Sequence, residues 1–259
     1  MTTGFKDHFS GQAAAYSTFR PTYPTALFDW LADNAPRRDR VWDVGTGSGQ
    51  AAGALAAHFE RVVGTDASSA QVAQASPHPR VEYRVAPAEA SGLPAAWADV
   101  ITVAQALHWF DLPKFFDEAK RVLAPDGLLA VWCYGDPKLD DPAVDRIVHD
   151  YNRGTVEKHW PRERDLVLKE YRTIAFPFRE ISTPSLMLGA SWTLPQLAGY
   201  LRSWSATACY AKILGRDPVV VVEEELSSVW GTPEAPRVIR WPITIRAGRP
   251  GSDEGSAAL

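Results

Sequence analysis

The chain has 259 residues, 46% of them hydrophobic, which suits one large α/β domain or one domain with a cap and argues against disorder. A net charge of −4 without any run of Lys or Arg argues against a nucleic-acid partner. Two cysteines, and six histidines without metal-ligand spacing, argue against a disulfide framework and a metal site. No signal-peptide pattern opens the sequence, and no apolar stretch of about 18 residues is present to cross a membrane. We therefore expect a cytoplasmic protein that contacts neither membrane nor nucleic acid.

The N-terminal segment, residues 1–24, is rich in aromatic side chains and ends in two prolines that prevent a helix. Residues 25–34 then have apolar side chains at helical spacing and predict a short amphipathic helix.

Between residues 40 and 133, apolar segments alternate with helical ones. Strands are predicted at residues 40–44, 61–65, 81–85, 100–104 and 128–133. Helices are predicted at residues 50–58, 69–75 and 113–123, and a turn at 125–127. Strands that alternate with helices are covered on both faces, so the pattern predicts a doubly wound α/β fold with a mostly parallel sheet.

This alternation breaks down after residue 134. Helices are predicted at residues 143–153, 164–172, 193–214 and 218–230, and strands at 179–188 and 237–245. The last segment, residues 248–259, is rich in Gly, Ser and Ala and predicts a disordered tail.

The first strand and the residues after it read V-W-D-V-G-T-G-S-G, at residues 41–49. The acid is Asp43, and the alternating glycines are Gly45, Gly47 and Gly49. Glycine permits the positive φ angles of a tight turn and lets backbone approach a ligand closely. The segment therefore predicts a loop that binds a nucleotide-like ligand.

Two such ligands fit the loop. Residues 47–52 match G-x-G-x-x-A, the dinucleotide fingerprint, and Asp66 at the end of the next strand can bond a ribose. This alternative is a nicotinamide-dependent dehydrogenase. The acid and alternating glycines of residues 43–49 also resemble motif I of the class I S-adenosylmethionine (SAM)-dependent methyltransferases.

Three later segments resemble the same family in the same order. Residues 86–90 are similar to its adenine-contact segment, residues 99–106 to its fourth strand, and residues 120–129 to its helix–turn–strand signature. With motif I they extend over residues 41–133, which favours the methyltransferase over the dehydrogenase. The resemblance implies a Rossmann-like sheet and SAM as the cofactor.

Residues 16–24, 106–111 and 201–206 resemble the type 11 methyltransferases, in the branch that includes trans-aconitate methyltransferases. This resemblance implies a small-molecule methyl acceptor, and we expect O-methylation of a carboxyl or hydroxyl group by a monomer or homodimer. A SAM-binding protein without activity and a methyltransferase scaffold that runs another reaction remain alternatives.

The predicted organisation has three parts. Residues 1–134 are the N-terminal segment and the SAM-binding core. Residues 135–247 are a helical insertion that covers the substrate and completes the sheet, and residues 248–259 are the tail.

Twelve residues are predicted to bind the cofactor, from the loop, from strand ends and by resemblance. They are Tyr16, Arg20, Asp43, Gly45, Thr46, Gly47, Gly49, Asp66, Ala67, Ala88, Glu89 and Gln105. For Asp43 an alternative role is to order the turn through backbone N–H groups.

His108 is the candidate catalytic base, which a hydroxyl acceptor needs and a carboxylate does not, although a structural role remains open. Aromatic side chains can also line a pocket for the substrate. The candidates are Trp109, Trp132, Tyr134 and Trp204, with burial in the core as the alternative.

Overall fold

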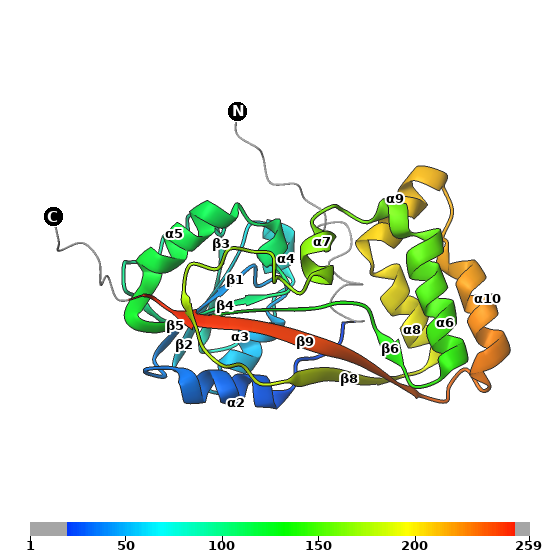
Figure 1. Cartoon of the computed structure of the whole chain (residues 1–259), viewed down its shortest axis with the longest axis horizontal. Helices are drawn as coiled ribbons and strands as arrows, with labels where there is room; N and C mark the ends of the chain where they lie inside the picture. Colours follow the sequence, from blue (N-terminus) through cyan, green and yellow to red (C-terminus); the bar gives the residue numbers. More distant parts are fainter. Residues whose placement is uncertain (1–19, 252–259) are drawn as a thin grey trace. The chain divides into compact units, whose positions relative to one another are not determined.

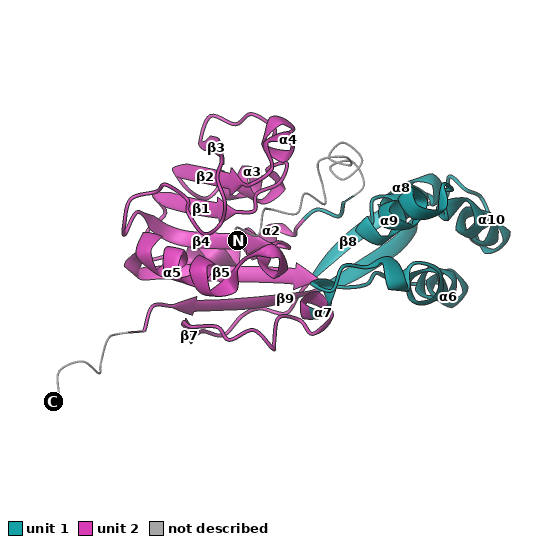
Figure 2. Cartoon of the chain, turned by 90° about the horizontal axis from the view of Figure 1, so that it is seen from above, with its two compact units in different colours: residues 1–22, 135–165, 187–242 teal, residues 23–134, 166–186, 243–259 magenta. Residues whose placement is uncertain are grey.

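The computed structural model describes residues 20–251, so the predicted cofactor contact of Tyr16 and the end of the predicted tail lie outside the described residues. The described chain divides into two compact units (Figure 2). Unit 1 contains residues 20–22, Gly135–Asp165 and Met187–Pro242. Unit 2 contains Tyr23–Tyr134, Leu166–Leu186 and residues 243–251.

Unit 2 is built on a sheet in the order β3-β2-β1-β4-β5-β9 (Figure 2). The strands are β1 (Arg40–Val44), β2 (Arg61–Asp66), β3 (Val81–Val85), β4 (Ala98–Ala104), β5 (Leu123–Tyr134) and β9 (Arg237–Arg249). The first five are parallel, and β9 joins β5 antiparallel. The prediction of a doubly wound, mostly parallel sheet is confirmed.

Four helices in the described part of unit 2 flank this sheet. They are α2 (Thr25–Asn34), α3 (Gln50–Leu55), α4 (Ser69–Ala73) and α5 (Leu112–Val122), with the 3₁₀ turn η1 (Leu107–Trp109). Of these helices, α2, α3 and α5 bury apolar side chains. Figure 1 shows α5 and α2 on opposite sides of the sheet. In α5, Phe115, Phe116 and Ala119 are buried at helical spacing. All of β4 except its last residue is buried, as expected for a strand that is covered on both faces.

The predicted turn at residues 125–127 lies inside β5 instead of before it. The pairing of β5 with β4 jumps from Leu123 opposite Ala98 to Leu128 opposite Val100. The residues between them are accommodated as an irregularity of one long strand, because its ends still find partners on β4.

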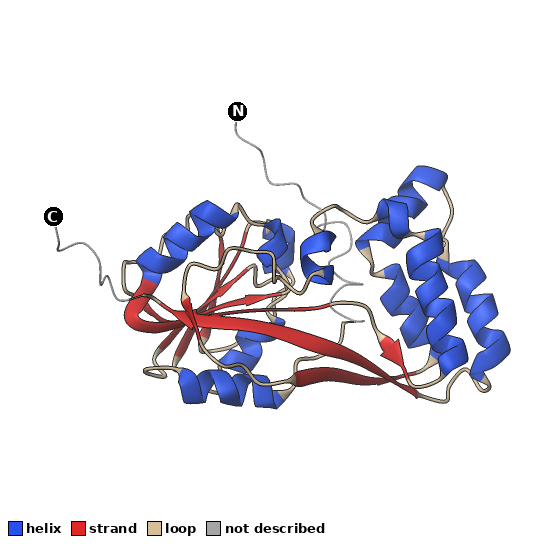
Figure 3. Ribbon diagram, in the orientation of Figure 1, coloured by secondary structure: helices blue, strands red, loops and turns tan. Residues whose placement is uncertain are grey.

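Unit 1 is mostly helical (Figure 3). Its helices are α6 (Pro142–Asp150), the π turn η2 (Tyr151–Thr155), the 3₁₀ turn η3 (Glu157–His159), α8 (Leu194–Arg202), α9 (Ser205–Leu214) and α10 (Val219–Trp230). Its strands are β6 (Lys138–Leu139), all but the first residue of β8 (Leu186–Trp192), and the first half of β9.

The single helix predicted at residues 193–214 is wrong, because α8 and α9 are separate. Ser203 Oγ donates to the carbonyl of Tyr200 at 2.7 Å, a local bond that competes with helix continuation. Trp204 then adopts an extended backbone before α9 begins.

Three other predicted boundaries are also wrong. Helix α7 (Arg164–Leu168) ends early because Glu170 and Tyr171 have φ of 55° and 56°, outside the helical region. The strand predicted at 179–188 is two strands, β7 (Arg179–Glu180) and β8. The helix predicted at 143–153 is α6 followed by the π turn η2.

The predicted tail begins too early. Gly248 pairs with Leu129 of β5 and with Glu180 of β7, so β9 continues to Arg249. A Cβ at Gly248 would lie 2.9 Å from the carbonyl oxygen of Arg179, so the close packing there requires glycine.

Residues 20–251 contain neither a helix suited to cross a membrane nor a cluster of metal-binding side chains. No helix there has the length and apolar character that a membrane span requires. No three side chains of His, Cys, Asp or Glu gather there as a metal site requires.

Candidate functional site

The loop between β1 and α3 has the backbone that its glycines predict. Gly45, Gly47 and Gly49 have φ of 66°, 57° and 85°, a region that strongly favours glycine. A Cβ at Gly45 would lie 2.6 Å from Cβ of Ala106, and one at Gly49 would lie 2.2 Å from Oη of Tyr83. The loop therefore needs glycine for its dihedral angles and, at these two positions, for space.

Asp43 lies beneath this loop, with no solvent exposure. Its two oxygens accept hydrogen bonds from Thr46 Oγ1 at 2.6 Å and from Thr102 Oγ1 at 2.7 Å. Burial raises the pKa of Asp43 to about 6 despite these hydroxyls. These bonds tie the loop to β4 and favour the ordering role of Asp43 over direct cofactor contact.

Asp66 ends β2 and holds the other side of the loop. Its Oδ2 accepts from the N–H of Gly47 at 2.9 Å, and its Oδ1 accepts from the N–H of Ser68 at 2.8 Å. Ala67 between them is half-buried. The carboxylate is half-buried too, so each oxygen can accept a further bond from a ligand hydroxyl.

Two residues beside the loop, Gln71 and Tyr83, were missed by the sequence analysis. Gln71 is 4% exposed, and its Oε1 lies 3.8 Å from the position that a Cβ on Gly47 would take. Neither Gln71 Oε1 nor Tyr83 Oη has a hydrogen-bond partner among the described residues. A buried acceptor without a donor is costly, so this edge is suited to a ligand that carries N–H or O–H groups.

Gln105 joins the carboxyl ends of β4 and β5. Its amide donates to the carbonyl of Tyr134 at 3.0 Å and accepts from the N–H of the same residue at 2.8 Å. Its φ of 55° is unusual for a residue other than glycine and marks local strain. Gln105 is a predicted cofactor contact, but both the oxygen and the nitrogen of its side-chain amide form hydrogen bonds to Tyr134.

Ala88 and Glu89 follow β3, as the predicted adenine-contact segment requires. Ala88 is 6% exposed, whereas Glu89 is half-buried. Glu89 Oε1 accepts from the N–H of Asp111 at 2.8 Å, just before α5 begins. This bond ties the segment after β3 to the segment after η1.

His108 lies in η1, directly after the end of β4, and is 8% exposed. Its Nδ1 and the Oη of Tyr171 share a hydrogen bond of 2.8 Å, and its ring lies 4.7 Å from that of Trp109. Burial lowers the pKa of His108 to about 3, so the imidazole is neutral at physiological pH. Tyr171 is separated from His108 by 63 positions, and no local pattern could have indicated the pair.

Three of the four aromatic candidates are buried. Trp132 has no solvent exposure and Tyr134 is 5% exposed, and in unit 2 the ring of Tyr23 meets both edge-on. Trp204 belongs to unit 1 and is 3% exposed. Trp109 is only half-buried.

Arg20, the predicted cofactor contact of the N-terminal segment, also belongs to unit 1. Its guanidinium donates to the carbonyl of Ser203 at 3.4 Å and lies 5.7 Å from the ring of Tyr200.

Comparison with known proteins identifies the family. The profile of a family described as "Methyltransferase domain" matches residues 42–131. A "Putative methyltransferase" of Dictyostelium discoideum is 35% identical over 233 residues, which are 89% of each protein. The chain belongs to the class I SAM-dependent methyltransferases.

Two further matches extend this result to the structure and to a more distant relative. The solved structure of a "Putative Type II Methyltransferase" from Anaeromyxobacter dehalogenans is 46% identical, with a TM-score of 0.84 over 90% of this chain and 100% of that one. The methyltransferase pgmE of Aspergillus terreus is 28% identical over 68% of this chain and 61% of its own length. The methyltransferase interpretation is therefore confirmed over the dehydrogenase alternative.

The residues around the loop fit SAM. Its ribose hydroxyls and its amino groups are donors, and the loop presents acceptors in Asp66 and in the unpartnered Oε1 of Gln71. Gly47 has no side chain there, and among the described residues only Gln71 comes within 4 Å of its Cβ position. The glycine loop of the methyltransferase thus has hydrogen-bonding groups that complement those of SAM.

Proposed function

We propose that the enzyme transfers the methyl group of SAM to a carboxylate oxygen of a small molecule, with a hydroxyl acceptor as the second candidate. The observation that supports this choice is the environment of His108, the candidate base. Its imidazole is buried and hydrogen-bonded to Tyr171, and it has no charged partner among the described residues.

Such an imidazole is poorly suited to removing a proton from a hydroxyl, because a base works best when its pKa is near the working pH. Burial holds the pKa of His108 at about 3, well below that range. A carboxylic acid has a pKa near 4 and is already deprotonated at neutral pH. A carboxylate acceptor therefore needs no base, and His108 then serves to shape the site together with Tyr171.

When bound, SAM supplies a methyl group on a positively charged sulfur, which is already activated for transfer. The chain's own task is then to orient the partners: Asp66 and Gln71 present acceptors, and Gly47 adds no side chain beside them. Holding two reacting groups in line is worth about 7–11 kcal/mol. General-base catalysis adds about 3–5 kcal/mol, so positioning dominates.

We further propose the branch of the family, the oligomeric state and the compartment of this enzyme. The motifs at residues 106–111 and 201–206 support the branch of trans-aconitate-type enzymes and a small-molecule acceptor. We propose a monomer or homodimer that works without nucleic acid or membrane. Cys133 and Cys209 are both free thiols, which agrees with the reducing conditions of the cytoplasm.

The test combines cofactor binding with product chemistry. Calorimetry with S-adenosylhomocysteine, the spent cofactor, should show binding, and NAD should show none. The enzyme with SAM is then offered matched carboxylic acids and alcohols, and methylated products are detected by mass spectrometry. A methyl ester releases methanol in mild alkali, whereas a methyl ether does not. Cofactor binding with methylation of alcohols alone contradicts the carboxylate proposal, and absence of cofactor binding contradicts the proposed function as a whole.

A further inference from the structure

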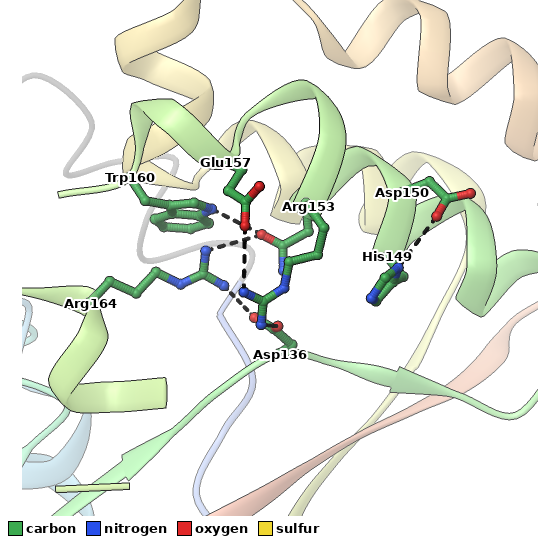
Figure 4. Close-up of polar contacts among 8 residues, drawn as sticks. Asp136, His149, Asp150, Arg153, Glu157, Trp160 and Arg164 are labelled. Atoms are coloured by element: carbon green, nitrogen blue, oxygen red, sulfur yellow. Dashed lines mark hydrogen bonds and ion pairs between the residues drawn. The ribbon is translucent and has the colours of Figure 1, made fainter. Parts of the chain in front are cut away.

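Unit 1 contains a partly buried group of charges that is separate from the residues of the cofactor loop (Figure 4). Two arginines, Arg153 of the π turn and Arg164 of α7, both donate to the single carboxylate of Asp136. Asp136 comes two residues after Tyr134, the last residue of β5. His149 and Asp150 form a separate, exposed pair on α6.

Arg164 is held rigidly in this group. Its side chain is 13% exposed, and its guanidinium carbon lies 3.6 Å from the centre of the Trp160 ring. Asn152, which is 2% exposed, accepts from Arg164 Nη1 at 3.1 Å and from Trp160 Nε1 at 2.9 Å. Stacking and hydrogen bonding thus fix the plane of a guanidinium whose burial lowers its pKa from the ordinary value, although an arginine stays charged.

Arg153 is the more accessible of the two, with 38% of its side chain exposed. Its Nη2 donates to Asp136 Oδ2 at 2.9 Å. Its Nη1 lies 4.0 Å from Glu157 Oε1, which is too far for a hydrogen bond, and Glu157 is 60% exposed. Because an exposed ion pair is largely screened, Glu157 neutralises little of this charge.

The charges near Asp136 therefore do not balance. Arg153 and Arg164 contribute two positive charges and Asp136 one negative charge, so among the described residues the second positive charge faces only the exposed carboxylate of Glu157, 4.0 Å from Arg153. A carboxylate carries one negative charge and would neutralise this positive charge. A phosphate dianion carries two, so one of its negative charges would stay unpaired. The fork of N–H groups on a guanidinium also matches the two oxygens of a carboxylate.

The backbone that carries Arg153 and Asn152 is also unusual. Both residues lie in a π turn, in which the N–H of Val156 donates to the carbonyl of Tyr151 at 3.1 Å. Turns of this kind are rare and are found frequently at functional sites.

We propose that Arg153 and Arg164 form a binding site in unit 1 for a carboxylate group of a small organic acid. This binding site goes beyond the proposed function and does not rest on it. Trp160 provides an apolar surface next to the bound carboxylate.

The experiment measures binding of acids to the full chain by calorimetry, without cofactor. The probes are a panel of aliphatic and aromatic carboxylic acids, the neutral methyl esters of the same acids, and inorganic phosphate. The variant is Arg153→Gln, because replacing the buried Arg164 risks unfolding unit 1. The control is Arg146→Gln, which removes an arginine on α6 that is 83% exposed. Circular dichroism checks that both variants are folded.

At least one acid should bind the wild type and the control alike, while Arg153→Gln raises its Kd about ten- to a hundredfold, the usual value of a hydrogen bond to a charged group. Arg153→Lys should recover only part of the affinity, because lysine lacks the fork. The affinity of Arg153→Gln for S-adenosylhomocysteine should stay unchanged.

Three outcomes overturn the inference: no acid binds more tightly than its ester, Arg153→Gln binds every acid as the control does, or phosphate binds more tightly than all of the acids. Failure of S-adenosylhomocysteine to bind the wild type overturns the proposed function instead. The two failures are distinguishable because the acids are titrated without cofactor.

Discussion

Replacing Asp43 with asparagine should make the stability of this protein less dependent on pH. The carboxyl group is fully buried beneath the glycine loop, and burial raises its pKa from 3.8 to about 6. Thr46 and Thr102 are its hydrogen-bond partners, and an asparagine of the same shape can pair with both hydroxyls. The variant therefore keeps the packing and removes the titration.

The sign of the effect follows from proton binding. An unfolded chain loses this proton near pH 4, whereas the folded protein keeps it to about pH 6. In that interval the folded state binds more protons, so the stability of the wild type falls as pH rises. At about 1.4 kcal/mol for each pKa unit, the full cost above pH 6 is about 3 kcal/mol.

Urea unfolding of the wild type and of Asp43→Asn, each at pH 4 and pH 7, measures this cost. The advantage of the variant in the free energy of unfolding should grow by about 2 kcal/mol between the two pH values. Asp117→Asn, which removes an exposed carboxylate on α5, controls for the change in net charge. A difference between variant and wild type that is the same at both pH values would refute the reasoning.

Three further predictions concern the site. His108→Asn should change kcat less than about tenfold, because a general base contributes about 10²–10⁴-fold, and kcat of the wild type should show no pH step between 6 and 7. A step in the wild type that His108→Asn removes contradicts the carboxylate proposal. Gly49→Ala should abolish binding of S-adenosylhomocysteine in calorimetry, because a Cβ there would lie 2.2 Å from Oη of Tyr83. The control is Gly53→Ala, at a helix position with open space, which should keep the binding and raise the Tm. Gln105→Ala should lower the free energy of unfolding by about 2 kcal/mol, since two hydrogen bonds to Tyr134 are lost. An unchanged midpoint of urea unfolding would show that these two hydrogen bonds do not stabilise the fold.

Much of unit 2 could be predicted from local pattern. The strands at residues 40–44 and 81–85 have the predicted bounds, because an apolar or alternating pattern between breakers encodes its own extent. The glycine loop was predictable for the same reason, since positive φ angles limit the choice of residue at each position.

Contacts between residues that are far apart in the sequence were not predictable. Thr102 is a polar residue inside the apolar strand V-I-T-V-A, and this exception was the available signal for its bond to Asp43. Gln71 and Tyr83 gave no such signal, because what distinguishes them is the lack of a partner in the folded chain.

The ion pairs of Arg153 and Arg164 with Asp136 were not predictable either, because they also join residues far apart in the sequence. Asp136 and Arg164 are 28 positions apart, in a region where the pattern predicted helices of the wrong length. The break between α8 and α9 likewise depends on one hydroxyl that bonds the backbone.

The sequence by itself determined that the chain forms a mostly parallel sheet with a glycine loop after its first strand, because periodicity and backbone freedom are local properties. Only the tertiary structure decided that Asp43 is buried, that His108 is neutral and paired with Tyr171, and that two arginines share one carboxylate. Protonation and charge balance depend on desolvation and on neighbours in space, and residues far apart in the sequence supply both.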